Sequence, residues 1–162
     1  MIEIRQTDDQ DFEAIWEIFH EVVSRGDTYA FDPNTNKMEA HKIWLETPTA
    51  TYIATKNDQI VGTYYIKPNF AGPGSHVCNA GFMVHPSARG KGVGKAMGQH
   101  ALTAAKTLGF LAMQFNMVVS TNTVAVNLWK SLGFSIIGTI PKAFNHKKLG
   151  FVDAFVMYQW LE

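Results

Sequence analysis

The run Arg89-Gly90-Lys91-Gly92-Val93-Gly94-Lys95 lies between an apolar stretch, residues 77–84, and a helical pattern, residues 92–108. Its three glycines remove side chains from alternate positions, and its three cations flank them. A helix N-terminus presents unpaired N–H groups and the positive end of the helix dipole, and both attract phosphate. The run therefore predicts a strand, a phosphate-binding loop and a helix in succession.

Two common phosphate loops do not fit this run. A Walker loop needs Ser or Thr after its lysine, and Ala96 follows Lys95. A dinucleotide loop of the form Gly-x-Gly-x-x-Gly needs a third glycine. That position is Lys95 if the motif begins at Gly90, and Met97 if it begins at Gly92. A flexible turn with solvated lysines would not need a strand before it and a helix after it, so the phosphate loop is favoured.

Apolar periodicity on either side of the loop predicts the remaining elements. Strands are expected at 2–5, 51–56, 59–67, 77–84, 111–119, 135–140 and 152–160. Helices are expected at 38–46, 92–108 and 122–132, and a further helix, capped by Asp8 or Asp9, has its apolar face from Phe12 to Val23. This order predicts an α+β fold: a mixed, mostly antiparallel sheet of about seven strands with helices on both faces. One domain is expected over 1–162, and the inner face of helix 92–108 is expected to include Leu108.

Composition excludes several classes of function. Lys plus Arg and Asp plus Glu each number 14, so no basic surface for nucleic acid is expected. Cys78 is the only cysteine, which excludes an internal disulfide and a multi-cysteine zinc site, and no metal is expected. No signal pattern and no apolar run of about 20 residues is present, so a cytoplasmic protein without a membrane partner is expected.

Two motifs resemble the GCN5-related N-acetyltransferase (GNAT) superfamily. Its cofactor loop, Arg/Gln-x-x-Gly-x-Gly/Ala, is matched by Arg89, Gly92 and Gly94. A second segment, Asn-x-x-Ala-x-x-Leu-Tyr-x-x-x-Gly-Phe, is matched by Asn122, Ala125, Leu128, Gly133 and Phe134. The resemblance covers nearly the whole chain, and it implies the GNAT fold with acetyl-CoA as co-substrate.

The resemblance also implies roles for particular residues. Main-chain groups of Met83 and Val84 would pair with the pantetheine arm as if it were an added strand. Arg89 and the main-chain amides of residues 90–95 would hold the pyrophosphate, and a separation of strands 77–84 and 111–119 would admit the thioester. Asn122 would cap its helix, hydrogen-bond the cofactor, or do both.

The chain departs from the family at two positions. Trp129 stands where many members have a tyrosine that protonates the departing thiolate, and an indole N–H is no useful acid near neutral pH. Asn79 stands where phosphinothricin-type relatives have a glutamate, and an amide cannot accept a proton. Direct attack by the amine is therefore expected, with its proton leaving through water. His76 and His85 are the nearby titratable side chains, although a histidine in such a loop is more often structural.

The stretches Ser75–Phe82 and Asn116–Asn122 resemble those of the yeast proline-analogue acetyltransferases, which acetylate azetidine-2-carboxylate. That resemblance implies that Asn79 binds the acceptor's carboxylate, while Asn116 and Asn122 set the geometry at the thioester. Asn116 lies in an apolar stretch, so it is expected to be buried, and either satisfied internally or kept for a ligand. A small amino or imino acid is therefore the predicted acceptor.

Two other functions stay open from the sequence. The aromatic loop with Tyr29 and Phe31, expected to bind the acceptor, and the strand with Asp153 suit acetylation of a phosphinothricin or a methionine derivative. The missing tyrosine and glutamate suit a CoA-binding regulatory module without turnover. The strand at 152–160 could pair across a homodimer, or it could be an ordinary strand of the sheet.

Overall fold

The computed structural model describes residues 1–162, which form a seven-stranded sheet in the order β1-β2-β3-β4-β5-β7-β6. All neighbouring strands are antiparallel except β4 and β5. The predicted α+β class, with a mixed and mostly antiparallel sheet, is confirmed. The strands are β1 (Glu3–Gln6), β2 (Ala50–Lys56), β3 (Gln59–Pro68), β4 (Val77–Val84), β5 (Ala112–Val119), β6 (Ser135–His146) and β7 (Gly150–Trp160).

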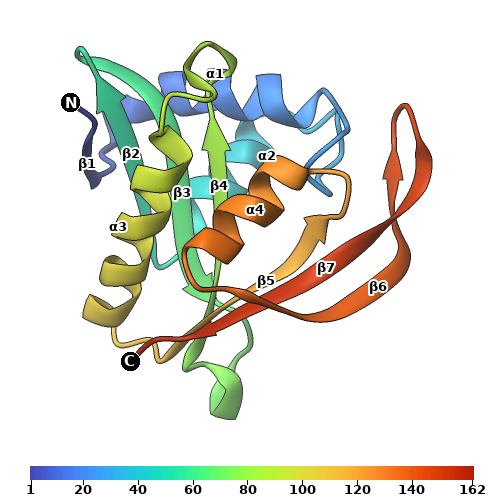
Figure 1. The fold of residues 1–162 in the computed structure, drawn as a ribbon. Coiled ribbons are helices and arrows are strands. Elements are labelled where there is room, and N and C mark those ends of the chain that lie inside the picture. The colour runs from blue at the N-terminus through green and yellow to red at the C-terminus, as the bar shows by residue number, and fades with distance from the viewer.

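Helices cover both faces of this sheet, as Figure 1 shows, with α3 and α4 in front and α1 and α2 behind. The α-helices are α1 (Phe12–Val23), α2 (Lys37–His41), α3 (Val93–Thr107) and α4 (Thr123–Ser131). Short helical turns lie next to the α-helices at η1 (Asp9–Asp11), η2 (Lys42–Glu46) and η4 (Pro86–Ala88), and between β3 and β4 at η3 (Gly72–Gly74). The helix predicted at 38–46 is therefore α2 continued by the π-helical turn η2.

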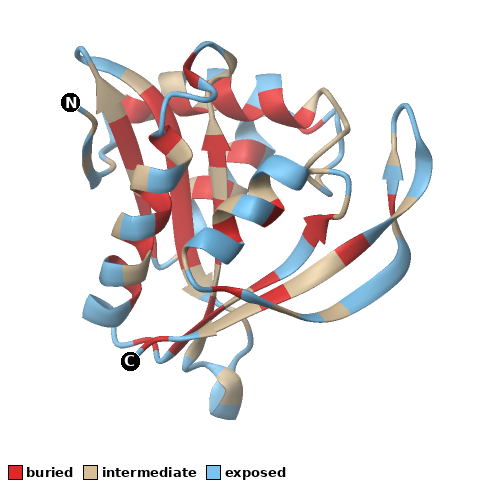
Figure 2. Ribbon diagram, viewed as in Figure 1, coloured by how far each residue is buried: buried red, intermediate tan, exposed pale blue.

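Two apolar cores lie on the two faces of the sheet, and Figure 2 shows buried residues concentrated in its central strands. The front core joins Tyr64 of β3 and Met97 of α3 to Trp129 of α4. The back core joins Phe19 of α1 and Trp44 of η2 to β2, β3 and β4. Leu108 was expected to face the core but is 38% exposed, because α3 ends at Thr107 and Leu108 is already its C-cap.

The parallel strands β4 and β5 pair only at their beginnings. Val77 pairs with Ala112 and Cys78 with Met113, and no further pairs follow. In β5 a bulge then shifts the register of the β5–β7 pairing between Phe115 and Val118. A bulge bends a strand and interrupts its ladder, so β5 turns away from β4. The predicted separation of these strands is therefore present.

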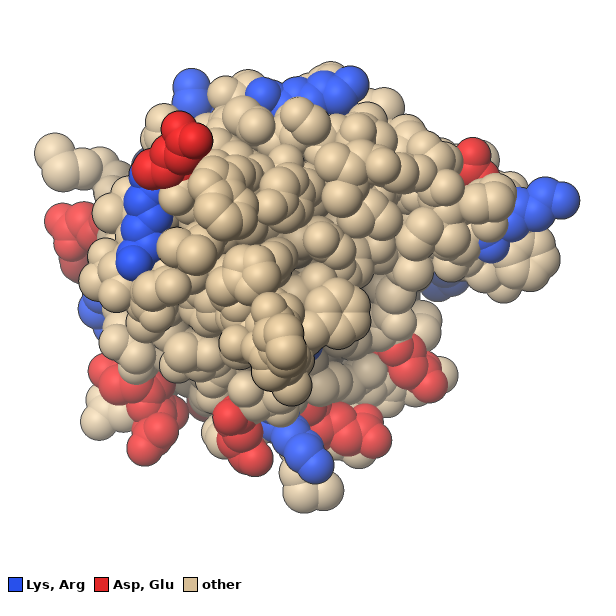
Figure 3. All heavy atoms as spheres, turned by 90° about the horizontal axis from the view of Figure 1, so that it is seen from below, with Lys and Arg blue, Asp and Glu red and all other residues tan.

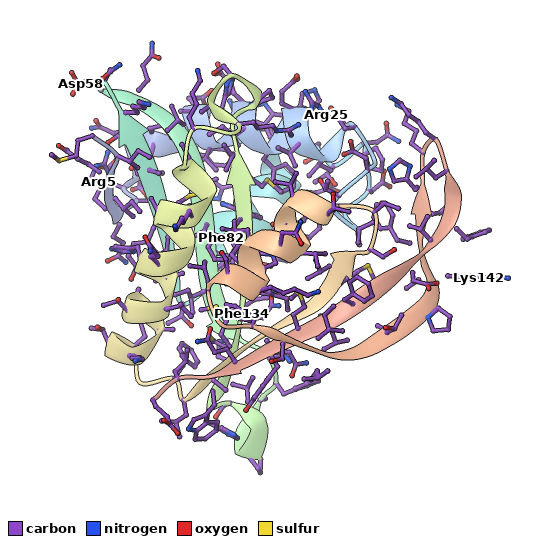
Figure 4. All side chains as sticks on the ribbon, viewed as in Figure 1. Arg5, Arg25, Asp58, Phe82, Phe134 and Lys142 are labelled. Carbon is purple, nitrogen blue, oxygen red and sulfur yellow. The ribbon has the colours of Figure 1, made fainter.

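The C-terminal hairpin differs from its prediction. β6 runs to His146 rather than ending near residue 140, and in Figure 1 the β6–β7 hairpin extends away from the helices. β7 lies between β5 and β6 and pairs with both, so it is an ordinary strand and has no free edge for pairing across a dimer. Asp153 accepts a hydrogen bond from the main-chain N–H of Lys142 at 2.9 Å, which holds a second bulge. Lys142 projects outward at the far side of the hairpin (Figure 4).

Charges on the surface show no large cluster of one sign in the view of Figure 3, where acidic and basic residues lie around the margin of a broad uncharged area. This distribution agrees with the equal numbers of acidic and basic residues. None of the helices combines the length and apolar character that a transmembrane segment needs.

His100 of α3 is a half-buried histidine that contacts the core, where Tyr64 Oη lies 2.6 Å from its Nδ1. Burial raises the pKa of Tyr64, so its hydroxyl keeps its proton and donates to the imidazole. Burial also lowers the pKa of His100 below the ordinary 6.5. The unfolded chain therefore binds a proton at a higher pH than the folded chain does, and folding stability is lost as the pH falls through the unfolded pKa.

We expect acidification from about pH 7.5 to about pH 5.5 to lower the free energy of unfolding more in the wild type than in His100→Gln. Urea unfolding at both pH values measures this difference. His20→Gln, which removes an exposed histidine of α1, should keep the wild-type dependence on pH. Equal losses in the wild type and in His100→Gln would contradict the prediction.

Candidate active site

A cavity of about 240 Å³ lies where β4 and β5 separate. Its walls come from the segment between α1 and α2, from Tyr65 of β3, from β4, from β5 and from α4 with its N-cap. None of the lining side chains carries a charge, and twelve of the seventeen are hydrophobic. The structure brings to this cavity six residues that sequence analysis singled out: Tyr29, Phe31, Asn79, Asn116, Asn122 and Trp129.

The edge of β4 that faces the cavity is set by its pairing with β3. His85 donates its main-chain N–H to Val61 at 2.8 Å, and the antiparallel register continues with Met83 opposite Thr63. Hydrogen-bonding groups alternate sides along a strand, so the main-chain groups of Met83 point to β3. Those of Phe82 and Val84 point to the separated side. The expectation that Met83 offers main-chain groups to a ligand is therefore wrong, and Phe82 takes its place beside Val84.

Tyr29 fills part of this open edge. Its hydroxyl donates to the carbonyl oxygen of Phe82 at 2.7 Å and accepts from the N–H of Phe82 at 2.6 Å. Its ring stacks on Phe31 with centroids 5.6 Å apart, and Phe31 lies 5.6 Å from Phe19 of α1. In Figure 4, Phe82 lies at the middle of β4, at the level of α4. The aromatic loop is therefore fixed against the strand and not only close to the cavity.

Asn79 bridges the two separating strands. Its Nδ2 donates to the main-chain oxygen of Gln114 in β5 at 3.0 Å, and its Oδ1 accepts from Tyr65 Oη at 3.3 Å. Asn79 lies opposite Lys67 in the β3–β4 register, and side chains of opposed residues share a face of the sheet. Both therefore lie on the α1 and α2 side, with Tyr65.

Asn116 was expected to be buried, and that expectation is wrong. It lies in the bulge of β5, where two residues leave the ladder, and its side chain is exposed. Its Nδ2 donates to Asn69 Oδ1 at 2.7 Å, and its Oδ1 accepts from Gln114 Nε2 at 3.1 Å. Asn116 is thus satisfied by other amides at the rim of the cavity.

Two residues of the second motif lie at the cavity's front wall. Trp129 packs against Phe82 and Phe115, with ring centroids 4.7 Å apart in both pairs. Asn122 is the N-cap of α4, and its side-chain oxygen accepts from Ala125 N at 3.3 Å. The predicted capping role is present, and the same side chain lines the cavity.

The glycine-rich loop has the geometry of an anion site. Gly90 and Gly92 have φ angles of 71° and 82°, in the left-handed region that favours glycine. The main-chain N–H groups from Gly90 to Lys95 have no acceptor elsewhere in the chain. Lys91 Nζ donates to the carbonyl oxygen of Ser87 at 2.8 Å and so holds the loop. Free amides at a helix N-terminus are what a phosphate group binds.

Gly94 has a different role from Gly92. A Cβ on Gly94 would lie 3.3 Å from Leu128 of α4, whereas nothing lies within 4 Å of a Cβ on Gly92. Gly94 therefore permits α3 and α4 to pack closely, and Gly92 leaves space above the free amides.

Arg89 is accompanied by a cation that sequence analysis missed. Burial lowers the pKa of Arg89, the positive charge of Arg25 lowers it further, and the carboxylates of Asp27 and Glu21 act in the opposite direction. Arg25 follows the end of α1, and Figure 4 labels it at that end of the helix. Its contact with Glu21 is long, at 3.8 Å. In the sequence, Arg25 is only an arginine that follows an amphipathic helix, and nothing there indicates that its charge acts on Arg89.

The remaining titratable side chains do not line the cavity. His76 Nδ1 contacts the carbonyl oxygen of Pro73 at 3.1 Å, and His85 caps η4 by accepting from Ser87 N at 3.2 Å. Cys78 is buried, and burial raises the pKa of its thiol to about 12. Both histidines have local structural contacts, and the thiol remains protonated near neutral pH.

Comparisons with known proteins agree with this geometry. A model of the acetyltransferase (GNAT) family matches residues 10–134. The chain belongs to this family. The N-acetyltransferase aca1 of Schizosaccharomyces pombe is 35% identical over 155 residues, which cover 85% of this chain and 74% of that protein. A GCN5-related N-acetyltransferase from Kribbella flavida is 45% identical, with a TM-score of 0.94 over 99% of this chain and 98% of its own.

The fold also matches a phosphinothricin acetyltransferase from Sinorhizobium meliloti solved with acetyl-CoA, with a TM-score of 0.88. That protein is 21% identical, and the match covers 99% of this chain and 88% of the other. Family membership confirms the prediction of an N-acetyltransferase with acetyl-CoA as co-substrate. The free amides of the loop and the open edge of β4 suit the phosphates and the amide-bearing arm of that molecule.

Gly92→Ala should weaken acetyl-CoA binding by about 10- to 100-fold, because a lost hydrogen bond to a charged group costs about 1.5–3 kcal/mol. Isothermal titration calorimetry measures the dissociation constant. Gly109→Ala is the matched control. Gly109 follows the opposite end of α3, has a φ of 90°, and likewise has nothing within 4 Å of its Cβ position. Both variants carry the same backbone strain, so equal effects on binding would contradict a role for the loop.

Proposed function

We propose that this chain transfers the acetyl group of acetyl-CoA to the amine of a small amino or imino acid by direct attack. The observation that carries this proposal is the small, uncharged cavity at the separation of β4 and β5. Its volume of about 240 Å³ is below the range of about 300–1,000 Å³ that is usual for drug-sized ligands. Because the acetyl end must enter the same space, the acceptor is small.

The uncharged lining favours an acceptor whose amine reacts in its neutral form. No carboxylate is present to bind an ammonium group or to take its proton. A small amine held against the carbonyl carbon gains its rate mainly from proximity and orientation. Its proton leaves through water at the cavity mouth, and the thiolate can depart unprotonated because a thiol has a pKa of about 8.5.

Lys67 supports an acceptor with a carboxylate. Its Nζ lies 5.2 Å from the ring centroid of Tyr65, a residue of the cavity wall, and Lys67 shares a face of the sheet with Asn79. One hydrogen of Asn79 Nδ2 is used by Gln114, and the second is free to donate. A carboxylate at this end of the cavity would meet an amide donor and an ammonium, and its amine would point along β4 towards Phe82.

Binding of acetyl-CoA is assigned to four parts of the chain. The amides from Gly90 to Lys95 take the pyrophosphate, and Arg89 with Arg25 supplies positive charge beside them. The edge groups of Phe82 and Val84 pair with the pantetheine arm. Asn122, which caps α4 at the front wall, lies beside the thioester. In this proposal residues 1–162 act as one acetyltransferase unit.

The two other functions have less support. Asp153, which suggested a phosphinothricin-type acceptor, lies outside the cavity and is engaged with Lys142. The regulatory module was suggested by Trp129 and Asn79 in place of a tyrosine and a glutamate, and the ring of Trp129 is one of four packed aromatic side chains in the front core. A tryptophan there has a structural reason, so it does not by itself argue against turnover.

Release of free thiol from acetyl-CoA, followed over a panel of amino and imino acids, tests the proposal. Proline analogues, phosphinothricin and methionine derivatives belong in the same panel, with mass spectrometry of the acetylated products. Turnover is expected with the small amino or imino acids. Tight binding of CoA without turnover of any amine would support the regulatory module and overturn the proposal.

Lys67→Met keeps the aliphatic stem over Tyr65 and removes the charge. We expect it to raise KM for the best acceptor by about two- to fivefold, which corresponds to the loss of a partly exposed charge interaction of about 0.4–1 kcal/mol. The amide derivative of the same acceptor, which lacks the carboxylate, should show no change in KM. A similar rise in KM for both compounds would assign Lys67 a structural role instead.

A further inference from the structure

The hydroxyl of Tyr29 takes the place of a neighbouring strand at Phe82. It makes two hydrogen bonds, at 2.7 and 2.6 Å, to the carbonyl oxygen and the N–H of this single residue. Phe82 lies beyond Cys78, the last residue of β4 that pairs with β5. The side chain of a segment far away in the sequence therefore satisfies main-chain groups that the sheet leaves unpaired.

The ring of Tyr29 is held in place on two sides. It stacks on Phe31 with an angle of 7° between the ring planes, and it meets the edge of Trp44 with centroids 6.3 Å apart. Burial raises the pKa of its hydroxyl well above the usual range for tyrosine. The phenol therefore remains protonated and acts as a hydrogen-bond donor, not as a base.

A thioester that enters along β4 meets this hydroxyl first. Its carbonyl oxygen can only accept hydrogen bonds, and the donor that points into the separation is the N–H of Phe82. When that N–H donates to the thioester oxygen instead, the hydroxyl oxygen of Tyr29 no longer accepts a hydrogen bond from Phe82. Its O–H group lies close by and can donate to the same carbonyl oxygen. The exchange gives the N–H a new acceptor, and it frees the carbonyl oxygen of Phe82, which then accepts an amide N–H of the pantetheine arm in place of the O–H of Tyr29.

We propose that Tyr29 is a catalytic residue, which donates a hydrogen bond to the thioester carbonyl oxygen together with the main-chain N–H of Phe82. This inference rests on the acetyl transfer to an amine described above. It assigns to the loop between α1 and α2 a role in the reaction itself, beyond contact with the acceptor.

Acetyl transfer then takes place in two steps, addition of the amine and departure of the thiolate. The lone pair of the amine nitrogen forms a bond to the carbonyl carbon, and the π pair of the C=O bond moves onto oxygen. Tyr29 and Phe82 stabilise the charge that develops there, in a cavity whose lining is mostly apolar. The pair then returns, the C–S bond breaks, and sulfur leaves with its electron pair as the thiolate. The amine proton passes to water, and Tyr29 keeps its own proton throughout.

Tyr29→Phe removes the hydroxyl and keeps the ring that stacks on Phe31. With the acceptor that the wild type uses best, we expect kcat to fall by about 10²–10³-fold, as for the loss of one donor to a developing oxyanion. KM for acetyl-CoA should change by less than about threefold, since the donor acts mainly on the transition state. Tyr52→Phe is the matched control, because it removes a phenol hydroxyl in β2 that lies outside the cavity.

A second measurement does not need turnover or an acceptor. Acetyl-CoA labelled with ¹³C at the carbonyl is bound to each protein, and the C=O stretching frequency is recorded by difference infrared spectroscopy. A hydrogen bond lowers this frequency, so the value should be higher in Tyr29→Phe than in the wild type and unchanged in Tyr52→Phe. Circular dichroism confirms that each variant is folded before comparison.

Two outcomes would overturn the proposal. One is a folded Tyr29→Phe variant with wild-type kcat and an unchanged C=O stretch. The other is unchanged kcat with tighter binding of acetyl-CoA, which would show that Tyr29 only occupies the N–H of Phe82 in the free protein. A wild type that acetylates no amine would instead refute the proposed function, and the infrared comparison would still decide the role of Tyr29.

Discussion

The incomplete pairing of β4 with β5 is the constraint on which the rest of this structure depends. After Cys78 and Met113 the two strands share no further pairs, so the following main-chain groups of β4 need other partners. An open strand edge inside a protein is costly unless something satisfies it. Here the hydroxyl of Tyr29 satisfies Phe82, and the remaining edge faces a cavity. The feature that would otherwise destabilise the sheet also leaves an edge for the proposed binding of an extended ligand as an added strand.

Aromatic rings and an amide side chain support the separating strands on both faces of the sheet. On the front, Phe115 of β5 packs on Trp129 at 4.7 Å and on Phe134 at 4.5 Å. On the back, Trp44 meets Tyr65 at 4.7 Å, and Asn79 ties β4 to Gln114 of β5. Such packing leaves the polar atoms of the cavity with little freedom to move. A site built in this way is pre-organised, and binding needs little further ordering.

The electrostatics of the molecule are local. Acidic and basic residues balance over the whole chain, so no overall field draws an anion to the site. The proposed phosphate site instead relies on the free amides from Gly90 to Lys95 and on the positive charges of Arg89 and Arg25. The cavity itself is uncharged, and burial keeps the phenol of Tyr29 protonated. The proposed sites of anion binding and of acyl transfer thus differ in polarity, since cations flank the first and no charged side chain lines the second.

The sequence by itself determined the features that depend on local chemistry. Gly90 and Gly92 allow the left-handed backbone that the loop adopts. The helical periodicity of residues 93–107 shows where α3 begins, and therefore where its free amides lie. Two motifs in the right order were therefore enough for the family, the fold class and acetyl-CoA. The capping role of Asn122 was predictable for the same reason, since a cap involves residues within one turn.

Only the tertiary structure decided how the strands present their groups. The register with β3 turns the main chain of Met83 away from the cavity and that of Phe82 towards it. The bulge in β5 exposes Asn116, and the position of β7 between two neighbours removes the free edge that a pairing dimer would need. Lys67, Arg25 and the contact of Tyr29 with Phe82 likewise join segments far apart in sequence. Local patterns specify that a residue lies in a strand. The direction of its hydrogen bonds and the identity of its neighbours follow from long-range pairing, because a shift of the pairing register by one residue moves every side chain to the other face of the sheet.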